Sequence, residues 1–347
     1  MTQRNAELDY ARAIGIVLVV FGHALRGLQA AGYLPEDGWA HATDYLIYTF
    51  HMPLFLIVSG ALFAPEKFSG PRSLLGKLSV LIVWPYLLWS IVQGAVLVVM
   101  ARFGAVNSVN ADWSWLLEIG WSPLGQFWFL YALFIAQVLA FFAYRRVPVW
   151  GMAAISLAAF AWFMVTRGPE VTILVSYGCF YFALGMMARK VDLFGRLPSR
   201  WPGALALLAA GAAIAVICLL TEVVPYWPIP AAIVMSLATI SVCKAMTPAL
   251  AGRSVGRWFA IIGQCSMGIY VLHILAIGAI RLGMTRFMGI TDPALLLVGI
   301  TLVATLVPVA VQLVALRLGI EKWCGMPSSA KPFTATGLRA GTAAPAS

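Results

Sequence analysis

Long apolar segments alternate with short polar ones along almost the whole chain. An α-helix needs about 17 to 25 apolar residues to cross a bilayer. Runs of that kind predict ten membrane-spanning helices, at 11–30, 43–64, 74–101, 125–144, 148–167, 170–188, 202–221, 227–245, 258–280 and 294–318. The pattern therefore predicts an all-α fold, a polytopic membrane helix bundle of about ten transmembrane helices.

The composition supports an integral membrane protein. The chain is 62% hydrophobic and 10% charged, with a mean hydropathy of +0.90, and a soluble domain of this length would not need so apolar a core. The net charge of +10 would suit a nucleic-acid partner, but the positions of the basic residues favour a simpler explanation. If the N-terminus is cytoplasmic, the outer segments hold only five of the 23 Lys and Arg, namely Arg26, Arg102, Arg167, Arg281 and Arg286. This bias predicts that both termini are cytoplasmic.

One membrane domain is expected, over residues 1–325. The segment 326–347 is rich in Ala, Ser, Thr, Gly and Pro, and it is expected to be a disordered cytoplasmic tail. The first apolar run is expected to be a retained helix rather than a signal peptide, because charged residues interrupt it and further spans follow. The five cysteines form no CxxC pair, so neither a disulfide framework nor a zinc site is expected.

Three of the four histidines, His23, His51 and His273, lie within predicted spans. Ionisable groups are costly in a bilayer, so these residues are the best lead to function. At the helical rise of about 1.5 Å per residue, each lies roughly 10–12 Å below the outer end of its span. A single buried histidine is as often a structural hydrogen-bonding group as a functional one. Because these three lie at the same depth, shared chemistry is favoured. No acidic or cysteine ligand accompanies them, so we expect general acid–base chemistry rather than a metal.

The inner end of the first predicted span carries an acidic and a basic residue. Asp9 and Arg12 are three residues apart and would share a helix face, where they can pair. The alternative is an ordinary amphipathic helix start with a basic anchor at the lipid headgroups. About 16 Å of helix separates Arg12 from His23. A substrate that touches both residues must therefore be long.

Five short motifs, in this order, resemble those of the acyltransferase-3 family of membrane O-acyltransferases, in particular its fucose O-acetylase-like members. The motifs are Arg4 to His23 with Leu8-Asp9 and Arg12, Phe50-His51-Met52-Pro53-Leu54-Phe55 leading to Ser59-Gly60, Lys77 with Trp84-Pro85-Tyr86, Phe127-Trp128-Phe129-Leu130, and Ser266 to His273. The resemblance extends over roughly residues 4 to 320. Many members carry an Arg-x-x-Arg pair before the third helix, whereas this chain has Arg72 and Lys77 there. We expect no appended esterase-like domain, which some relatives use.

The resemblance implies an enzyme that transfers an acyl group, usually acetyl from acetyl-CoA, to a hydroxyl of a cell-surface or lipid-linked saccharide at the bacterial inner membrane. It also implies that Arg12 and His23 are the functional pair, with Asp9 beside Arg12. Coenzyme A carries several phosphates, which suit a cradle of Arg12, Arg72 and Lys77. The positive-inside bias alone would also account for Arg72 and Lys77.

The acceptor hydroxyl needs a base, and His23 is the expected one. A covalent acetyl-histidine would fit equally well. His51 is expected to orient the acceptor or stabilise the oxyanion, with helix packing as the alternative, and a structural hydrogen bond is favoured for His273. Gln126 and Trp128 begin the fourth span, where they could bind a sugar, although Trp128 would serve equally as an interface anchor.

A different class of function is a transporter in which the buried histidines relay protons. It would be favoured by inverted repeats or by acidic residues at the membrane midplane, and the sequence has neither. A non-catalytic scaffold would leave the three histidines unexplained. The expected partners are membrane lipid, acyl-CoA and a saccharide acceptor, with no nucleic acid and no metal. The sequence leaves the oligomeric state open.

Overall fold

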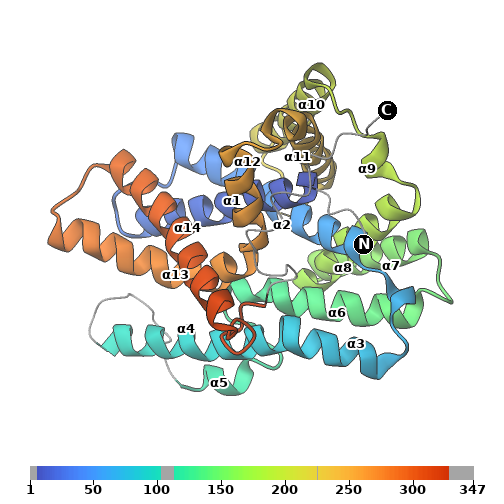
Figure 1. The fold of residues 1–347 in the computed structure, drawn as a ribbon, viewed down its shortest axis with the longest axis horizontal. Coiled ribbons are helices and arrows are strands. Elements are labelled where there is room, and N and C mark those ends of the chain that lie inside the picture. The colour runs from blue at the N-terminus through green and yellow to red at the C-terminus, as the bar shows by residue number, and fades with distance from the viewer. Residues whose placement is uncertain (1–5, 103–112, 225, 328–347) are drawn as a thin grey trace, which may run out of the picture.

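The computed structural model describes residues 6–102, 113–224 and 226–327, and over these residues the chain forms helices and no strand (Figure 1). The long helices are α1 (Ala6–Ala30), α2 (Gly38–Leu62), α4 (Trp84–Arg102), α6 (Trp128–Ala143), α7 (Val149–Val165), α8 (Glu170–Lys190), α10 (Trp201–Leu220), α11 (Ile229–Leu250), α13 (Ser266–Leu282) and α14 (Pro293–Leu318). The shorter helices are α3 (Pro71–Leu78), α5 (Trp115–Glu118), α9 (Leu193–Arg196) and α12 (Ser254–Gln264). Single 3₁₀ or π turns lie at η1 (Pro65–Lys67), η2 (Ser79–Val83), η3 (Gly125–Phe127) and η4 (Gly283–Phe287).

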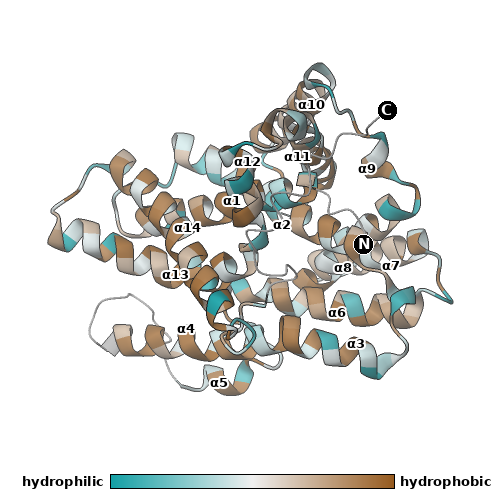
Figure 2. Ribbon diagram, in the orientation of Figure 1, coloured by the Kyte–Doolittle hydropathy of each residue, from teal (hydrophilic) through white to brown (hydrophobic). Residues whose placement is uncertain are grey.

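The predicted all-α membrane bundle is confirmed. Nine helical segments of the described chain are long and apolar enough to cross a membrane, and α7, with 17 residues, is a shorter apolar helix at the place of the expected span 148–167. Large apolar side chains are exposed on the outer helices, as at Leu220 of α10 and Leu295 of α14. Figure 2 shows that the long helices are predominantly hydrophobic. Such surfaces are stable against lipid rather than against water.

Helix α1 lies at the centre of the contacts that build the site. It packs against α2, α11, α12, α13 and α14. Its buried residues include Ile16, Val20 and Leu25, which belong to the main hydrophobic core. A helix enclosed in this way can hold polar side chains away from lipid, which is where ionisable groups inside a membrane are tolerated.

Helices α2 and α8 approach each other through two glycines. A Cβ atom on Gly60 would lie 2.0 Å from the carbonyl oxygen of Phe182, and one on Gly185 would lie 2.0 Å from that of Ile57. Only a residue without a side chain fits at either position. Small residues of this kind let membrane helices pack backbone to backbone. The contact fixes the inner end of α2, which carries part of the site.

The predicted span 74–101 is helical from Pro71 to Arg102 but includes the π turn η2. This turn directly precedes Trp84 and Pro85. Proline has no N–H to donate and its ring clashes with the preceding helical turn, so the backbone widens there. The turn separates α3, which faces the site with Lys77, from α4.

The predicted span 258–280 is not one continuous helix. The chain breaks at Cys265, so α12 ends at Gln264 and α13 begins at Ser266. Just before the break, a Cβ on Gly263 would be 1.9 Å from the carbonyl oxygen of Asp9. Helix α12 therefore lies directly on the start of α1.

The expected tail, 326–347, lies outside the described residues apart from its first two. Met326 is buried, and its carbonyl accepts a hydrogen bond of 3.2 Å from Gln312 of α14. The packed chain therefore continues to Pro327.

Candidate active site

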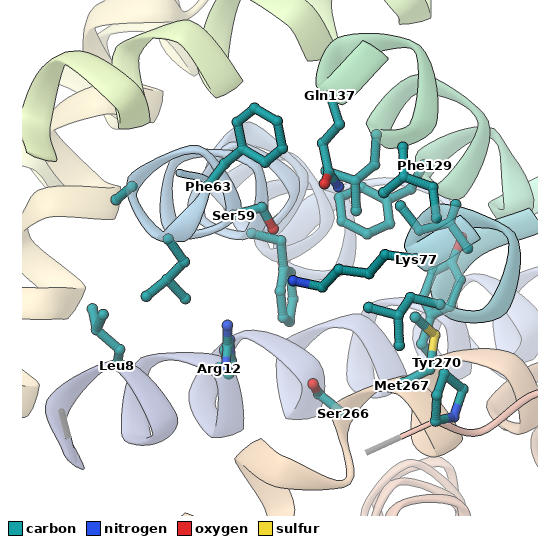
Figure 3. Close-up of a pocket in the computed structure, with 18 of the residues that line it drawn as sticks. Leu8, Arg12, Ser59, Phe63, Lys77, Phe129, Gln137, Ser266, Met267 and Tyr270 are labelled. Atoms are coloured by element: carbon teal, nitrogen blue, oxygen red, sulfur yellow. The ribbon is translucent and has the colours of Figure 1, made fainter. Parts of the chain in front are cut away.

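A cavity of about 1160 Å³ opens between α1, α2, α3, α6 and α13 (Figure 3). It lies at the end of the bundle where α1 and α3 begin and α2 and α8 end, which the positive-inside pattern assigns to the cytoplasm. We refer to it as the inner cavity. Its volume exceeds that of most pockets for a drug-sized molecule, about 300–1000 Å³. A large, elongated ligand would fit such a space.

Four cationic side chains from the described residues line the inner cavity: Arg12, Lys67, Lys77 and Arg189. Figure 3 shows that Arg12 of α1 and Lys77 of α3 point toward the same space. The only carboxylate in this lining is that of Asp9, 3.6 Å from the Arg12 guanidinium. The expected pairing of Asp9 with Arg12 is thus present. The excess of positive charge favours an anionic ligand.

Arg189 is held in place at the cavity mouth. It donates to the backbone carbonyl of Phe63 at 2.7 Å and pairs with the carboxylate of Glu66. Glu66 lies in the short turn between α2 and α3, where its own backbone N–H and the Arg189 guanidinium lower the pKa of its carboxyl group. A carboxylate that stays ionised keeps Arg189 fixed beside the cavity.

The rest of the lining is neutral. Ser59 of α2, Gln137 of α6 and Ser266 of α13 supply hydrogen-bonding groups, and Phe129 and Tyr270 close the far side, with ring centroids 5.7 Å apart. Figure 3 shows these side chains around the same space. A lining that combines cations with weakly polar and aromatic groups suits a ligand with a charged head and a neutral arm.

The three predicted histidines come together in the fold. The ring centroids of His23 and His273 are 5.0 Å apart, and Tyr48 lies 6.0 Å from the ring of His23 and 4.7 Å from that of His51. His51 and His273 are almost completely buried, whereas His23 is partly exposed. We refer to these three histidines as the histidine cluster. Their common depth therefore reflects a genuine cluster of three imidazoles.

Two members of the cluster have their ring orientation fixed by the backbone. Nδ1 of His51 is 2.7 Å from the carbonyl oxygen of Ile47, and Nδ1 of His273 is 2.6 Å from that of Tyr270. A carbonyl only accepts, so both rings carry the proton on Nδ1 and present a lone pair at Nε2. The Nε2 atom of His273 is buried and makes no hydrogen bond within the described residues.

The inner cavity ends one helical turn from the histidine cluster. Its lining includes Val19, four residues before His23, and Tyr270, three residues before His273. A separation of three or four residues is about 5 to 6 Å along a helix. The cavity and the cluster are therefore adjacent compartments, and the cluster itself does not line the cavity.

The remaining predicted site residues lie elsewhere. Arg72 is exposed and does not line the inner cavity, although Lys77 on the same helix does. Gln126 is buried and exchanges two amide hydrogen bonds with Gln93 of α4, at 2.7 and 3.2 Å. Trp128 is partly buried and packs edge-on against Phe129 and Tyr177. Gln126 and Trp128 are thus tied into helix packing.

Several lining residues could not be inferred from the sequence. Lys67 and Arg189 look like ordinary positive-inside charges, and Ser59 and Gln137 look like isolated polar residues in apolar spans. Their shared position arises only when α2, α6 and α8 pack together. Within the described residues, no group of three or more His, Cys, Asp and Glu side chains is placed to hold a metal ion.

Comparison with known proteins identifies relatives. A family model described as an acyltransferase domain matches residues 5–313. Nodulation protein NolL of Mesorhizobium japonicum is 27% identical over 187 residues, and nodulation protein NolL of Sinorhizobium fredii is 30% identical over 190 residues. Each alignment covers 53% of this chain and 48% of the relative, so the chain spans about half the length of the curated relatives it matches. No solved structure matches.

Proposed function

This chain belongs to the membrane acyltransferase family whose domain it matches over residues 5–313, and from that membership we propose that it transfers an acyl group, acetyl in the simplest case, from cytoplasmic acyl-CoA to a saccharide hydroxyl. The acceptor would be a cell-surface or lipid-linked saccharide at the bacterial inner membrane. The observation that carries the proposal is the inner cavity, which runs from four cations to within one helical turn of His23.

The charge and size of the inner cavity favour coenzyme A as the donor. Coenzyme A has several phosphates at one end and a long, slender arm that ends in the thioester. Arg12, Lys77 and Arg189 are positioned to bind phosphates at the cavity mouth, where guanidinium groups bind phosphate oxygens in pairs. The neutral interior beyond Ser59 then accommodates the arm. About 16 Å of helix α1 lies between Arg12 and His23, which accounts for the need for a long donor.

The proposed chemistry uses His23 as the general base. The acceptor hydroxyl transfers its proton to Nε2 of His23 while its oxygen attacks the thioester carbonyl, so a C–O bond forms and the C–S bond breaks. The coenzyme A sulfur leaves as a thiolate and takes the proton from the imidazolium. In the equally balanced alternative, His23 itself attacks the thioester and passes the acyl group to the hydroxyl.

The reaction requires the cavity to reach the imidazole. The part of its lining nearest the histidine cluster is formed by Val19 and Tyr270. Small side-chain movements on donor binding would extend the cavity by the one helical turn that separates these residues from the cluster. His23 is the least buried of the three histidines, and we expect an acceptor to approach its ring. His51 and His273 are almost completely buried, so contact between their Nε2 lone pairs and a saccharide hydroxyl would require the site to open when the acceptor binds.

The test uses the purified chain in lipid nanodiscs with radiolabelled acetyl-CoA and a panel of saccharides. Thiol release and label transfer should depend on both the protein and the acceptor. His23→Ala should abolish transfer and leave the affinity for coenzyme A unchanged. His41→Ala, which alters an exposed histidine near the start of α2, is the matched control and should keep full activity. Full turnover by His23→Ala would exclude the proposed base, and acceptor-independent label retention on His23 would favour the covalent route.

A further inference from the structure

Tyr48 contacts His23 through its hydroxyl group. The oxygen lies 3.4 Å from Nδ1 of His23, at the long end of hydrogen-bond distances. Contacts of this kind often tighten only when substrate binds. Tyr48 lies on α2 and His23 on α1, so the contact joins the two helices. The same nitrogen in His51 and His273 is directed instead at a carbonyl of its own helix.

The sequence of α1 makes room for this contact. Gly22 precedes His23, and a Cβ atom at that position would lie 3.0 Å from Cε2 of Tyr48. A Cβ atom there would force the tyrosine ring to shift by a few tenths of an ångström. By contrast, a Cβ on Gly27 of the same helix would make only an ordinary contact of 3.8 Å with Ile277. The approach of the Tyr48 ring to α1 therefore depends on one particular glycine.

A charged pair holds Tyr48 from its other side. The guanidinium carbon of Arg26 lies 3.3 Å from the centroid of the Tyr48 ring. Arg26 in turn makes a bidentate ion pair with Asp44, at 2.7 and 2.8 Å. Cation–π contact and a two-point ion pair both restrict side-chain rotation. Tyr48 is thus packed between Gly22, the Arg26 guanidinium and the rings of His23 and His51.

We propose that Tyr48 is the positioning residue of His23, a role that rests on the proposed acyl transfer. Its oxygen accepts the proton that His23 carries on Nδ1, so Nε2 keeps the lone pair that a base needs. When Nε2 takes the acceptor proton, the imidazolium still donates from Nδ1 to Tyr48. No proton leaves Nδ1 during the cycle. Arg26 and Asp44 act on His23 indirectly in this role, because they fix the ring of Tyr48, which contacts it.

The direct test is ¹⁵N NMR of histidine-labelled protein in nanodiscs, because the chain has only four histidines and the chemical shifts of the two ring nitrogens report the tautomer. His23→Gln assigns the His23 signals. In the native chain, His23 should show a single tautomer with the proton on Nδ1. Tyr48→Phe should give a mixture of tautomers. Tyr45→Phe is the matched control, because that hydroxyl, also on α2, donates to the carbonyl of Val223.

Activity supplies the second readout. Tyr48→Phe should lower kcat roughly tenfold, as expected for one lost orienting hydrogen bond, with the KM for acetyl-CoA unchanged. Gly22→Ala should have the same effect on the tautomer and on kcat, whereas Gly27→Ala should have neither.

The two readouts separate this proposal from the acyl transfer on which it rests. Unchanged His23 signals in Tyr48→Phe, or altered signals with an unchanged kcat, would overturn the positioning role. If the native chain showed no transfer at all, the proposed function would fail, while the NMR comparison would still decide whether Tyr48 fixes the ring.

Discussion

The imidazole rings of His23 and His273 lie with their centroids 5.0 Å apart and their planes inclined by 49°. The two residues come from opposite ends of the chain and meet because α13 packs directly against α1. Helix α1 also carries Arg12, which lines the inner cavity. One helix therefore connects the cationic mouth of the cavity with the histidine cluster. The contribution of the cavity-lining cations to donor binding can be tested without changing the histidines.

Lys77 and Arg72 provide a matched pair of cations on helix α3. Lys77 lines the inner cavity and Arg72 does not. We expect Lys77→Ala to raise the KM for acyl-CoA roughly tenfold, because a hydrogen bond to a charged group contributes about 1.5–3 kcal/mol. Arg72→Ala should leave it within about twofold. Steady-state kinetics over a range of donor concentrations checks both variants, and equal effects would mean that charge on the inner surface, rather than the cavity, attracts the donor.

Arg189 and Lys190 are adjacent cations at the end of α8, and only the first lines the inner cavity. Arg189 lines the inner cavity and bonds to the Phe63 carbonyl, whereas Lys190 is exposed and outside the lining. We expect Arg189→Gln to weaken coenzyme A binding at least tenfold and Lys190→Gln to have little effect. Isothermal titration calorimetry with coenzyme A measures both. A normal affinity in Arg189→Gln would remove this residue from the proposed donor site.

The spans could be predicted from the sequence because membrane helices are long and uniformly apolar. The break at Cys265 was missed, although Gln264 and Ser266 interrupt the apolar pattern on either side of it; Gly263, just before the break, contacts the backbone of α1. Nothing in the local pattern of α12 or α13 records which helix will pack against that glycine.

The candidate site was predictable where a polar residue interrupts an apolar span, as at His23, His51 and His273. His23 and Arg12 stand out as polar residues in one apolar span. Lys67 and Arg189 join the site through tertiary packing, so local pattern could not separate them from ordinary positive-inside charges. Helical spacing alone could have distinguished Arg72 from Lys77, because five residues correspond to about 140° around a helix.

The crossing of α2 and α8 predicts a large effect of a very small substitution. Gly60→Ala would place a methyl group 2.0 Å from the Phe182 carbonyl oxygen, and overpacking of this kind costs about 1–3 kcal/mol or more. We expect a clear fall in the thermal unfolding midpoint in detergent. Gly76→Ala in α3, where no atom lies within 4 Å of the added Cβ, should not lower the midpoint, because alanine favours the helix over glycine. Similar midpoints for the two variants would contradict the backbone contact.

Lys244 of α11 fixes the end of the short helix α9. Its ammonium group donates to the carbonyls of Phe194, Gly195 and Leu197, at 2.7, 3.1 and 2.9 Å. Lys244→Met keeps the apolar stem but leaves three helix-end carbonyls without a charged donor, which should destabilise the fold by about 1–3 kcal/mol. Because neither Lys244 nor the carbonyls it bonds belong to the lining of the inner cavity, the KM for acyl-CoA should not change. Thermal unfolding together with donor kinetics checks both expectations, with Lys190→Met as the control. A raised KM without lost stability would show that Lys244 acts on the donor rather than on the fold.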